Sequence, residues 1–149
     1  MTTIETLKTT ADAAELDELL WRILWQPIGL PRSVRGKLNI EGKKFELVLK
    51  ENRRIVGGLV AVWTADTEIE LRHLAVDFDA QRKGIGRRLV NELSRIAALK
   101  KCHRLHTIAR NTSIGFFRKI GFRTAPGQAP QHPVFVKQGI TFKLMEKFV

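Results

Sequence analysis

The chain has one cysteine, Cys102, no tyrosine and no long apolar run. A single cysteine excludes an internal disulfide framework and is typical of a reducing compartment. No apolar stretch approaches the roughly 18 residues that a membrane-spanning helix needs. Residues 1–8 have neither the basic start nor the apolar core of a signal peptide. We therefore expect a cytoplasmic protein with no membrane partner.

Acidic residues are scarce in the second half of the chain. Residues 81–149 hold 15 Lys and Arg but only two acids, Glu92 and Glu146, whereas residues 1–80 hold 11 Lys and Arg against 13 Asp and Glu. This asymmetry indicates an anionic partner for the second half. Nucleic acid, a polyphosphate cofactor and a merely solvated basic face all agree with the composition.

Composition and periodicity predict one globular domain over residues 1–149. Hydrophobic residues make up 44% and charged residues 28% of the chain, with no internal repeat or Pro/Gly-rich linker. Strands are predicted at residues 2–8, 45–49, 55–63, 68–76, 104–109, near 122 and at 134–147, and helices at 11–25, after Pro31, at 84–99 and at 112–120. The outline is an α/β (α+β) domain, a mixed sheet flanked by helices.

The most informative segment joins the predicted strand 68–76 to the predicted helix 84–99 through a basic turn with two glycines, Gly84 and Gly86. The first amides of a helix have no partners within it and lie at its positive dipole end. Glycines there let an anion approach the backbone closely, which suits pyrophosphate. The alternative is that the two glycines only shape a tight turn.

Two other phosphate-binding motifs do not fit the sequence. The dinucleotide fingerprint needs a third glycine where Leu89 stands and an acid about twenty residues later, but no acid lies between Glu92 and Glu146. A P-loop needs four residues between its glycines and a hydroxyl after its lysine, and the segment from Gly36 to Lys44 has neither.

Two motifs resemble those of the GNAT N-acetyltransferase superfamily. Gln81-Arg-Lys-Gly84-Ile-Gly86 is similar to its Gln/Arg-x-x-Gly-x-Gly/Ala signature, and the segment from Asn111 to Phe122 is similar to its second motif. The resemblance covers residues 47–122. It implies a mostly antiparallel mixed sheet with splayed central strands, acetyl-CoA as the donor and a primary amine as the acceptor.

The resemblance also implies a cofactor-binding set. The strand before the basic turn would run beside the pantetheine arm, the amides of residues 82–87 would hold the phosphates, and the amide near Leu74 would polarise the thioester carbonyl. The full set is Leu74, Ala75, Val76, Gln81, Arg82, Lys83, Gly84, Ile85, Gly86, Arg87, Asn111 and Phe117.

A protonated amine needs a base before it can attack a thioester. Glu70 lies six residues before Val76, where the histone-acetylating branch of the family carries its base, so we expect Glu70 to act through a water molecule. His73 is the alternative base, since imidazole titrates near neutral pH. Glu70 is equally compatible with an exposed strand residue paired with Arg72.

The absence of tyrosine departs from the family, because many members carry one where Phe117 stands to protonate the departing thiolate. Either water supplies that proton or the chain is a non-catalytic acyl-CoA-binding module. A nucleic-acid-binding protein is the third alternative. The acceptor class and a homodimeric state are left open.

We expect no metal site. Cys102, His103 and His106 are close in sequence, but residues 103 and 106 would point to opposite faces of a strand. Trp21, Trp25 and His132 are interpreted either as packing residues or as walls of an acceptor pocket.

Overall fold

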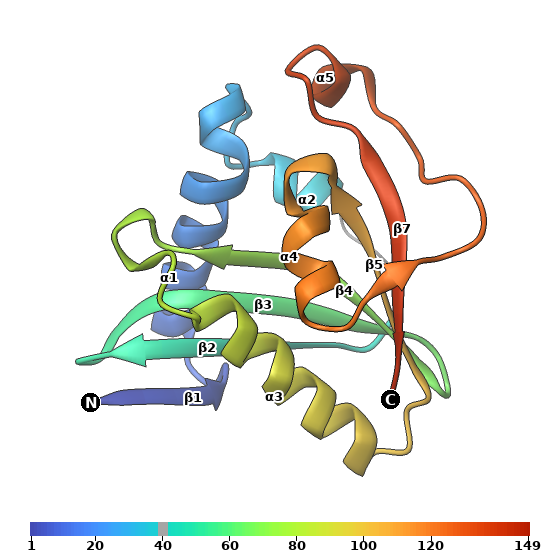
Figure 1. Ribbon diagram of the computed structural model, residues 1–149. Coiled ribbons are helices and arrows are strands. Elements are labelled where there is room, and N and C mark those ends of the chain that lie inside the picture. The colour runs from blue at the N-terminus through green and yellow to red at the C-terminus, as the bar shows by residue number, and fades with distance from the viewer. Residues whose placement is uncertain (39–41) are drawn as a thin grey trace.

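The computed structural model describes residues 1–38 and 42–149. Its centre is a seven-stranded sheet with the order β1-β2-β3-β4-β5-β7-β6 (Figure 1). Neighbouring strands are antiparallel except β4 and β5, which are parallel. The strands are β1 (Thr2–Thr6), β2 (Lys44–Glu51), β3 (Arg54–Ala65), β4 (Glu68–Val76), β5 (Arg104–Arg110), β6 (Arg123–Thr124) and β7 (Phe142–Phe148).

Helices cover both faces of this sheet. In Figure 1, α3 crosses in front of β2 and β3 and α1 runs behind them. The helical segments are α1 (Thr10–Leu20), the π-helical turn η1 (Trp21–Trp25), η2 (Gln26–Ile28), α2 (Val34–Lys37), η3 (Phe78–Ala80), α3 (Ile85–Leu99), η4 (Asn111–Ser113), α4 (Ile114–Lys119) and α5 (Pro133–Val136). No helix in the described ranges is both long and apolar enough to cross a membrane. The predicted mixed sheet flanked by helices is confirmed.

Each face of the sheet carries its own apolar core. Side chains of α3 and α4 pack with one face, and those of α1, η1 and α5 with the other. Adjacent glycines of β3 let helices approach both faces. A Cβ at Gly57 would lie 2.7 Å from Cγ2 of Ile85, and one at Gly58 would collide with Cδ1 of Leu16. A side chain at either position would therefore force Ile85 or Leu16 to move.

The predicted strand 134–147 is wrong in its first half. Residues 133–136 form α5 instead, and β7 begins only at Phe142. Pro133 occupies the first turn, where its missing N–H costs nothing, and Nδ1 of His132 accepts from the amide of Val134 at 3.3 Å. Phe135 is buried in the α1-side core, which fixes the short helix against the sheet.

The predicted helix 112–120 corresponds to two shorter helical segments. A 3-10 turn, η4, precedes α4, and the side chain of neither Asn111 nor Thr112 caps it. The amide of Asn111 instead donates to the carbonyl of Gly139 at 3.1 Å, and its oxygen accepts from Thr141 N at 3.3 Å. Asn111 therefore ties the end of β5 to the segment that precedes β7.

Candidate active site

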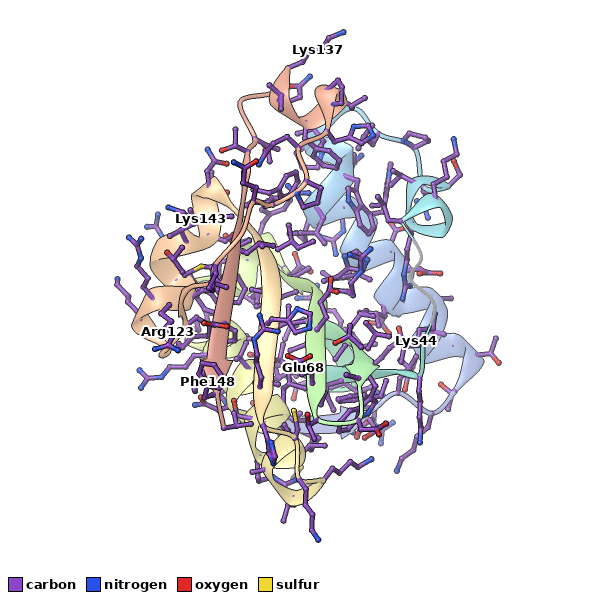
Figure 2. All side chains as sticks on the ribbon, turned by 90° about the vertical axis from the view of Figure 1, so that its right-hand side faces the viewer. Lys44, Glu68, Arg123, Lys137, Lys143 and Phe148 are labelled. Atoms are coloured by element: carbon purple, nitrogen blue, oxygen red, sulfur yellow. The ribbon has the colours of Figure 1, made fainter. Side chains whose placement is uncertain are left out.

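The two central strands diverge after a short parallel pairing. β4 and β5 pair only from Glu68–Arg104 to Leu71–Thr107. Beyond that point β4 continues beside β3 to Val76, and β5 continues beside β7 to Arg110. In Figure 2, Glu68 marks the paired end of these strands and Lys137 lies at the far end of the molecule, beyond the divergence.

A bulge in β4 sits where the divergence begins. Val60 of β3 pairs with His73 and Ala61 pairs with Leu71, so Arg72 is the extra residue. A bulge bends its strand and re-aims the following side chains. Ile69 and Leu71 face the α3-side core, and after the bulge Leu74 and Val76 face it too. Glu70 and His73 are left for the α1 side.

The gap between the strands opens a cavity of about 300 Å³. It extends from the divergence of β4 and β5 to α4 on one side and to η1 and α5 on the other. Its walls include Trp25, Glu70, Arg72, His73, Leu74, Arg110, Phe116, Phe117, Gln131, His132 and Phe135. Both expected bases and Leu74 thus come together in one cavity.

Glu70 is buried and paired inside this cavity. Its side chain is 8% exposed, and Nη1 of Arg72 donates to its Oε1 at 3.1 Å. Nη2 of Arg72 also donates to the carbonyl of Leu38. The arginine therefore fixes one carboxylate oxygen, while Oε2 takes part in no hydrogen bond with the described residues. The Arg72 pairing considered for Glu70 is confirmed, but the exposed position is wrong, because the bulge and the cavity wall enclose the side chain.

His73 lies against Trp25, with ring centroids 5.1 Å apart in an edge-to-face arrangement. Burial and the nearby guanidinium groups of Arg72, Arg35 and Arg110 lower the pKa of His73 to about 3. The imidazole is therefore neutral at physiological pH, and its surroundings oppose the uptake of a proton.

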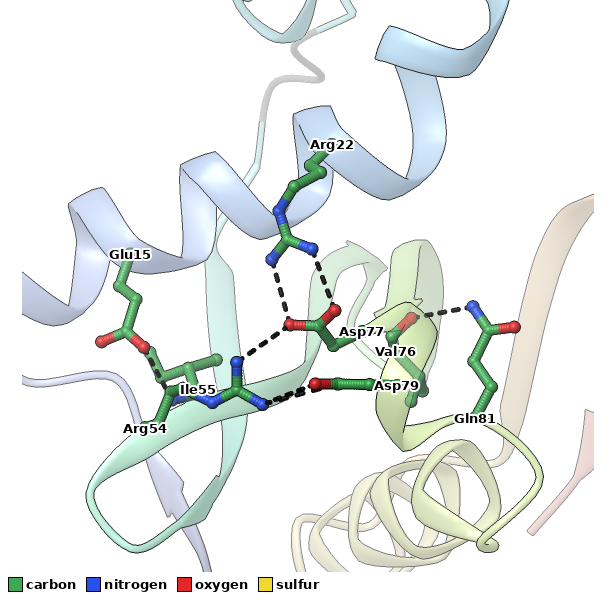
Figure 3. Close-up of polar contacts among 8 residues, drawn as sticks. All are labelled: Glu15, Arg22, Arg54, Ile55, Val76, Asp77, Asp79 and Gln81. Atoms are coloured by element: carbon green, nitrogen blue, oxygen red, sulfur yellow. Dashed lines mark hydrogen bonds and ion pairs between the residues drawn. The ribbon is translucent and has the colours of Figure 1, made fainter.

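A carboxylate anchors the turn that follows β4. Asp77 accepts from Nη1 and Nη2 of Arg22 at 2.9 and 3.1 Å (Figure 3). The hydrogen-bonded Arg22 guanidinium holds the pKa of Asp77 below its usual range. Nε2 of Gln81 donates to the carbonyl of Val76 at 3.0 Å, which closes the turn from its other end. Gln81 therefore shapes the loop rather than extending from it.

The basic turn and the start of α3 leave free backbone amides. Gly84 and Arg82 both have positive φ, at 78° and 66°. The first α3 amide with a helical partner is that of Arg88, which donates to the carbonyl of Gly84 at 3.0 Å. No side chain caps this end, and a Cβ at Gly84 would meet nothing within 4 Å. The amides of residues 85–87 are thus open to a ligand, and Arg82, Lys83 and Arg87 are exposed around them. We call this group the cradle, and its charge is of the kind that suits an anion.

The remaining expected cofactor residues differ in their surroundings. A Cβ on Gly86 would lie 3.2 Å from the ring of Phe116, so that glycine lets α3 pack against α4. Phe117 is buried between Phe116 and Phe122, at 5.2 Å from each ring, and reaches the cavity wall. The side chains of Ala75 and Val76 pack into opposite cores, so only their backbone is available to a ligand. Asn111 is not among the cavity-lining residues.

Other residues singled out in the sequence divide between packing and the cavity. Trp25 and His132 line the cavity, whereas Nε1 of Trp21 donates to the carbonyl of Leu30 at 2.9 Å. Cys102 is buried, and burial raises the pKa of its thiol. His106 lies 2.9 Å from the hydroxyl of Thr64. Within residues 1–38 and 42–149 no three His, Cys, Asp or Glu gather as metal ligands would.

Sequence reasoning missed one charged residue of the cavity, Arg110, and the aromatic wall that Phe135 provides. Arg110 follows an apolar run at the end of β5, and a basic residue there is a weak signal. Phe135 was assigned to a strand, so its contribution to the cavity from a short helix was not visible in the alternation pattern.

Comparison with known proteins gives a family and a fold. The family described as "Acetyltransferase (GNAT) domain" matches residues 43–124. The structure resembles the ribosomal-protein-S18-alanine N-acetyltransferase from Escherichia coli (TM-score 0.80, 21% identity, 100% of this chain and 94% of that one). It also resembles a putative N-acetyltransferase from Lactobacillus plantarum (0.82, 16%, 99% and 97%) and PaiA N-acetyltransferase from Thermoplasma acidophilum in complex with coenzyme A (0.71, 18%, 99% and 99%).

Proposed function

The chain belongs to the GNAT acetyltransferase family, and we propose that it transfers an acetyl group from acetyl-CoA to a primary amine by direct attack in a ternary complex. The observation that carries this proposal is the single cavity between β4 and β5 that holds Glu70 and Leu74. The uncapped N-terminus of α3 follows β4 after residues 77–84, which include η3. We also propose that residues 1–149 act as one domain, since β1 and β7 belong to the same sheet.

The donor binds through backbone groups in this proposal. Amides of residues 82–87 and the exposed basic side chains around them suit a pyrophosphate, because α3 presents its positive dipole end there. The Thermoplasma neighbour, solved with coenzyme A, supports this donor. When bound, acetyl-CoA supplies an activated acyl group, and the amide near Leu74 polarises its carbonyl.

Glu70 is the proposed base. Of the described residues that line the cavity it is the one acid, so it attracts an ammonium group and takes up the proton that the amine must lose. Arg72 holds its Oε1, which leaves Oε2 for a bridging water. His73 is a weaker alternative, because burial and three nearby arginines oppose a positive charge on its ring.

Acetyl transfer has to account for every proton without a tyrosine side chain. Glu70 takes one proton from the ammonium group before the N–C bond forms. The second proton leaves the nitrogen after attack, and water carries it to the thiolate as the C–S bond breaks. Free thiols of this type have a pKa of about 8.5, so a thiolate is a tolerable leaving group. Phe117, which lines the cavity where many members have tyrosine, also favours a second candidate: an acyl-CoA-binding module without turnover.

Calorimetric titration with acetyl-CoA and free CoA, followed by a thiol-release assay over a panel of amines, tests the proposal. We expect micromolar CoA binding and amine-dependent thiol release. Binding without release from any amine would support the non-catalytic module, and absence of binding would overturn both. Competition by RNA at low salt would then favour a nucleic-acid partner.

A further inference from the structure

Arg110 is a half-buried cation, and the described residues offer it no acidic partner. Nη2 donates to the carbonyl of Leu24 at 2.7 Å, and the guanidinium carbon lies 5.5 Å from the ring centre of Phe135. Across the described ranges, no carboxylate lies within ion-pair distance of it. The other arginines with half-buried side chains do have such partners, namely Arg22, Arg35, Arg72 and Arg104.

This arrangement leaves a positive charge on the cavity wall. Burial lowers the pKa of Arg110, although a guanidinium stays protonated at any physiological pH. A carbonyl and an aromatic face compensate only part of the cost of removing the ion from water. Among the described residues that line the cavity, Glu70 is the one acid and is already bound to Arg72, and His73 is neutral. A ligand anion is therefore the missing partner.

The position of Arg110 indicates which ligand carries this anion. Its guanidinium contacts η1 and lies by Phe135, both of which belong to the α1 side of the sheet. The cradle for the donor phosphates is the N-terminus of α3, which packs on the opposite face. Phosphates held at that cradle lie across the sheet from Arg110, so the anion belongs to the acceptor.

Glu70 and Arg110 face the same side of the sheet. Glu70 pairs with His106 in register, and residues 106, 108 and 110 of β5 share one face by alternation. β4 and β5 diverge between Glu70 and Arg110, and the amine must reach the acyl group in this gap. We propose that the acceptor is an amine that also carries a carboxylate, such as a free amino acid, with Arg110 binding the carboxylate while Glu70 takes the proton of the amine. A guanidinium fork matches a carboxylate with two parallel hydrogen bonds.

This inference rests on the proposed function and is tested with pairs of acceptors that differ only in charge. Each amino acid is compared with its own carboxamide at several pH values, so that the fraction of free amine is matched. We expect kcat/KM to favour the acid by about ten- to hundredfold, the effect of a charge-assisted hydrogen bond. Arg110→Gln should remove the preference by raising KM for the acid, and Arg110→Lys should keep part of it.

Two controls separate this binding role from general damage. Arg95→Gln changes an exposed α3 arginine paired with Glu92, and we expect it to keep the full preference. CoA affinity, measured by calorimetry, should be equal in Arg110→Gln and the wild type. A loss of CoA affinity in that variant would assign Arg110 to the donor and overturn the inference.

The remaining outcomes are distinct from failure of the proposed function. Equal rates with acid and amide, or a preference for polyamines, would overturn the carboxylate assignment and leave acetyl transfer intact. If CoA binds but no amine releases thiol, the binding of N-acetyl amino acids and their amides is measured in the presence of CoA. Acid-selective binding that depends on Arg110 would retain the carboxylate site, and its absence would remove it.

Discussion

The carboxylate of Glu70 and the guanidinium of Arg72 are joined by a hydrogen bond of 3.1 Å within β4. Arg72 is the extra residue of the bulge, so the geometry that starts the strand divergence also holds the carboxylate at its base. The pair keeps a buried charge satisfied while one oxygen remains available. The bulge at Arg72 therefore both starts the strand divergence and positions the carboxylate of Glu70.

Glu70→Gln should lower kcat at neutral pH by about a hundredfold or more, the usual contribution of a general base. CoA affinity should stay within about twofold, because Glu70 lies away from the α3 cradle. Glu68→Gln is the matched control, since Glu68 lies on the same strand and pairs with Arg104 outside the cavity. The steady-state rate of thiol release measures the effect, and unchanged turnover in Glu70→Gln would remove Glu70 as the base.

Gly86→Val should weaken CoA binding more than tenfold without unfolding the domain. A Cβ there already lies 3.2 Å from the ring of Phe116, so a branched side chain must push α3 and α4 apart beside the cradle. Gly115→Ala on α4 meets nothing within 4 Å and is the control. Calorimetry with CoA and thermal unfolding measure both properties, and retained affinity would contradict the cradle assignment.

Much of the fold was predictable because the informative segments are local. Predicted strand 68–76 coincides with β4, and predicted helix 84–99 differs from α3 by one residue. Helical periodicity arises from burial of one face, which α3 has through Ile85, Leu89, Leu93 and Ala97.

The arrangement of the cavity was less predictable, because it depends on contacts far apart in the sequence. Alternation alone cannot reveal the bulge at Arg72, which is defined by the register against Val60 and Ala61. The amide of Asn111 is engaged by Gly139 and Thr141, 28 and 30 residues away. Arg110 gains its role from Leu24, a residue 86 positions earlier, and no local pattern carries that information.

Asp77→Asn should destabilise the fold by about 1–3 kcal/mol, since it breaks a buried pair and leaves Arg22 without its carboxylate. CoA affinity should fall as well, because Asp77 anchors the start of the turn that leads to the cradle. Asp79→Asn is the control, as its side chain is 69% exposed and contacts Arg54 alone. Urea unfolding and calorimetry measure the two effects, and equal behaviour of the two variants would contradict the anchor.

The neutral state of His73 predicts how stability depends on pH. Because the pKa of His73 is about 3 in the folded protein and about 6.5 when unfolded, the unfolded chain binds the extra proton as pH falls below 6.5. The folded state therefore loses stability on acidification, by about 2 kcal/mol between pH 7 and pH 5 from this group. His73→Gln should lack that component, whereas His103→Gln, at an exposed position, should keep the wild-type pH dependence. Urea unfolding at pH 7, 6 and 5 measures the difference in slope. Parallel curves for wild type and His73→Gln would mean that the imidazole takes up its proton in the folded protein, which would restore His73 as a rival to Glu70 for the role of base.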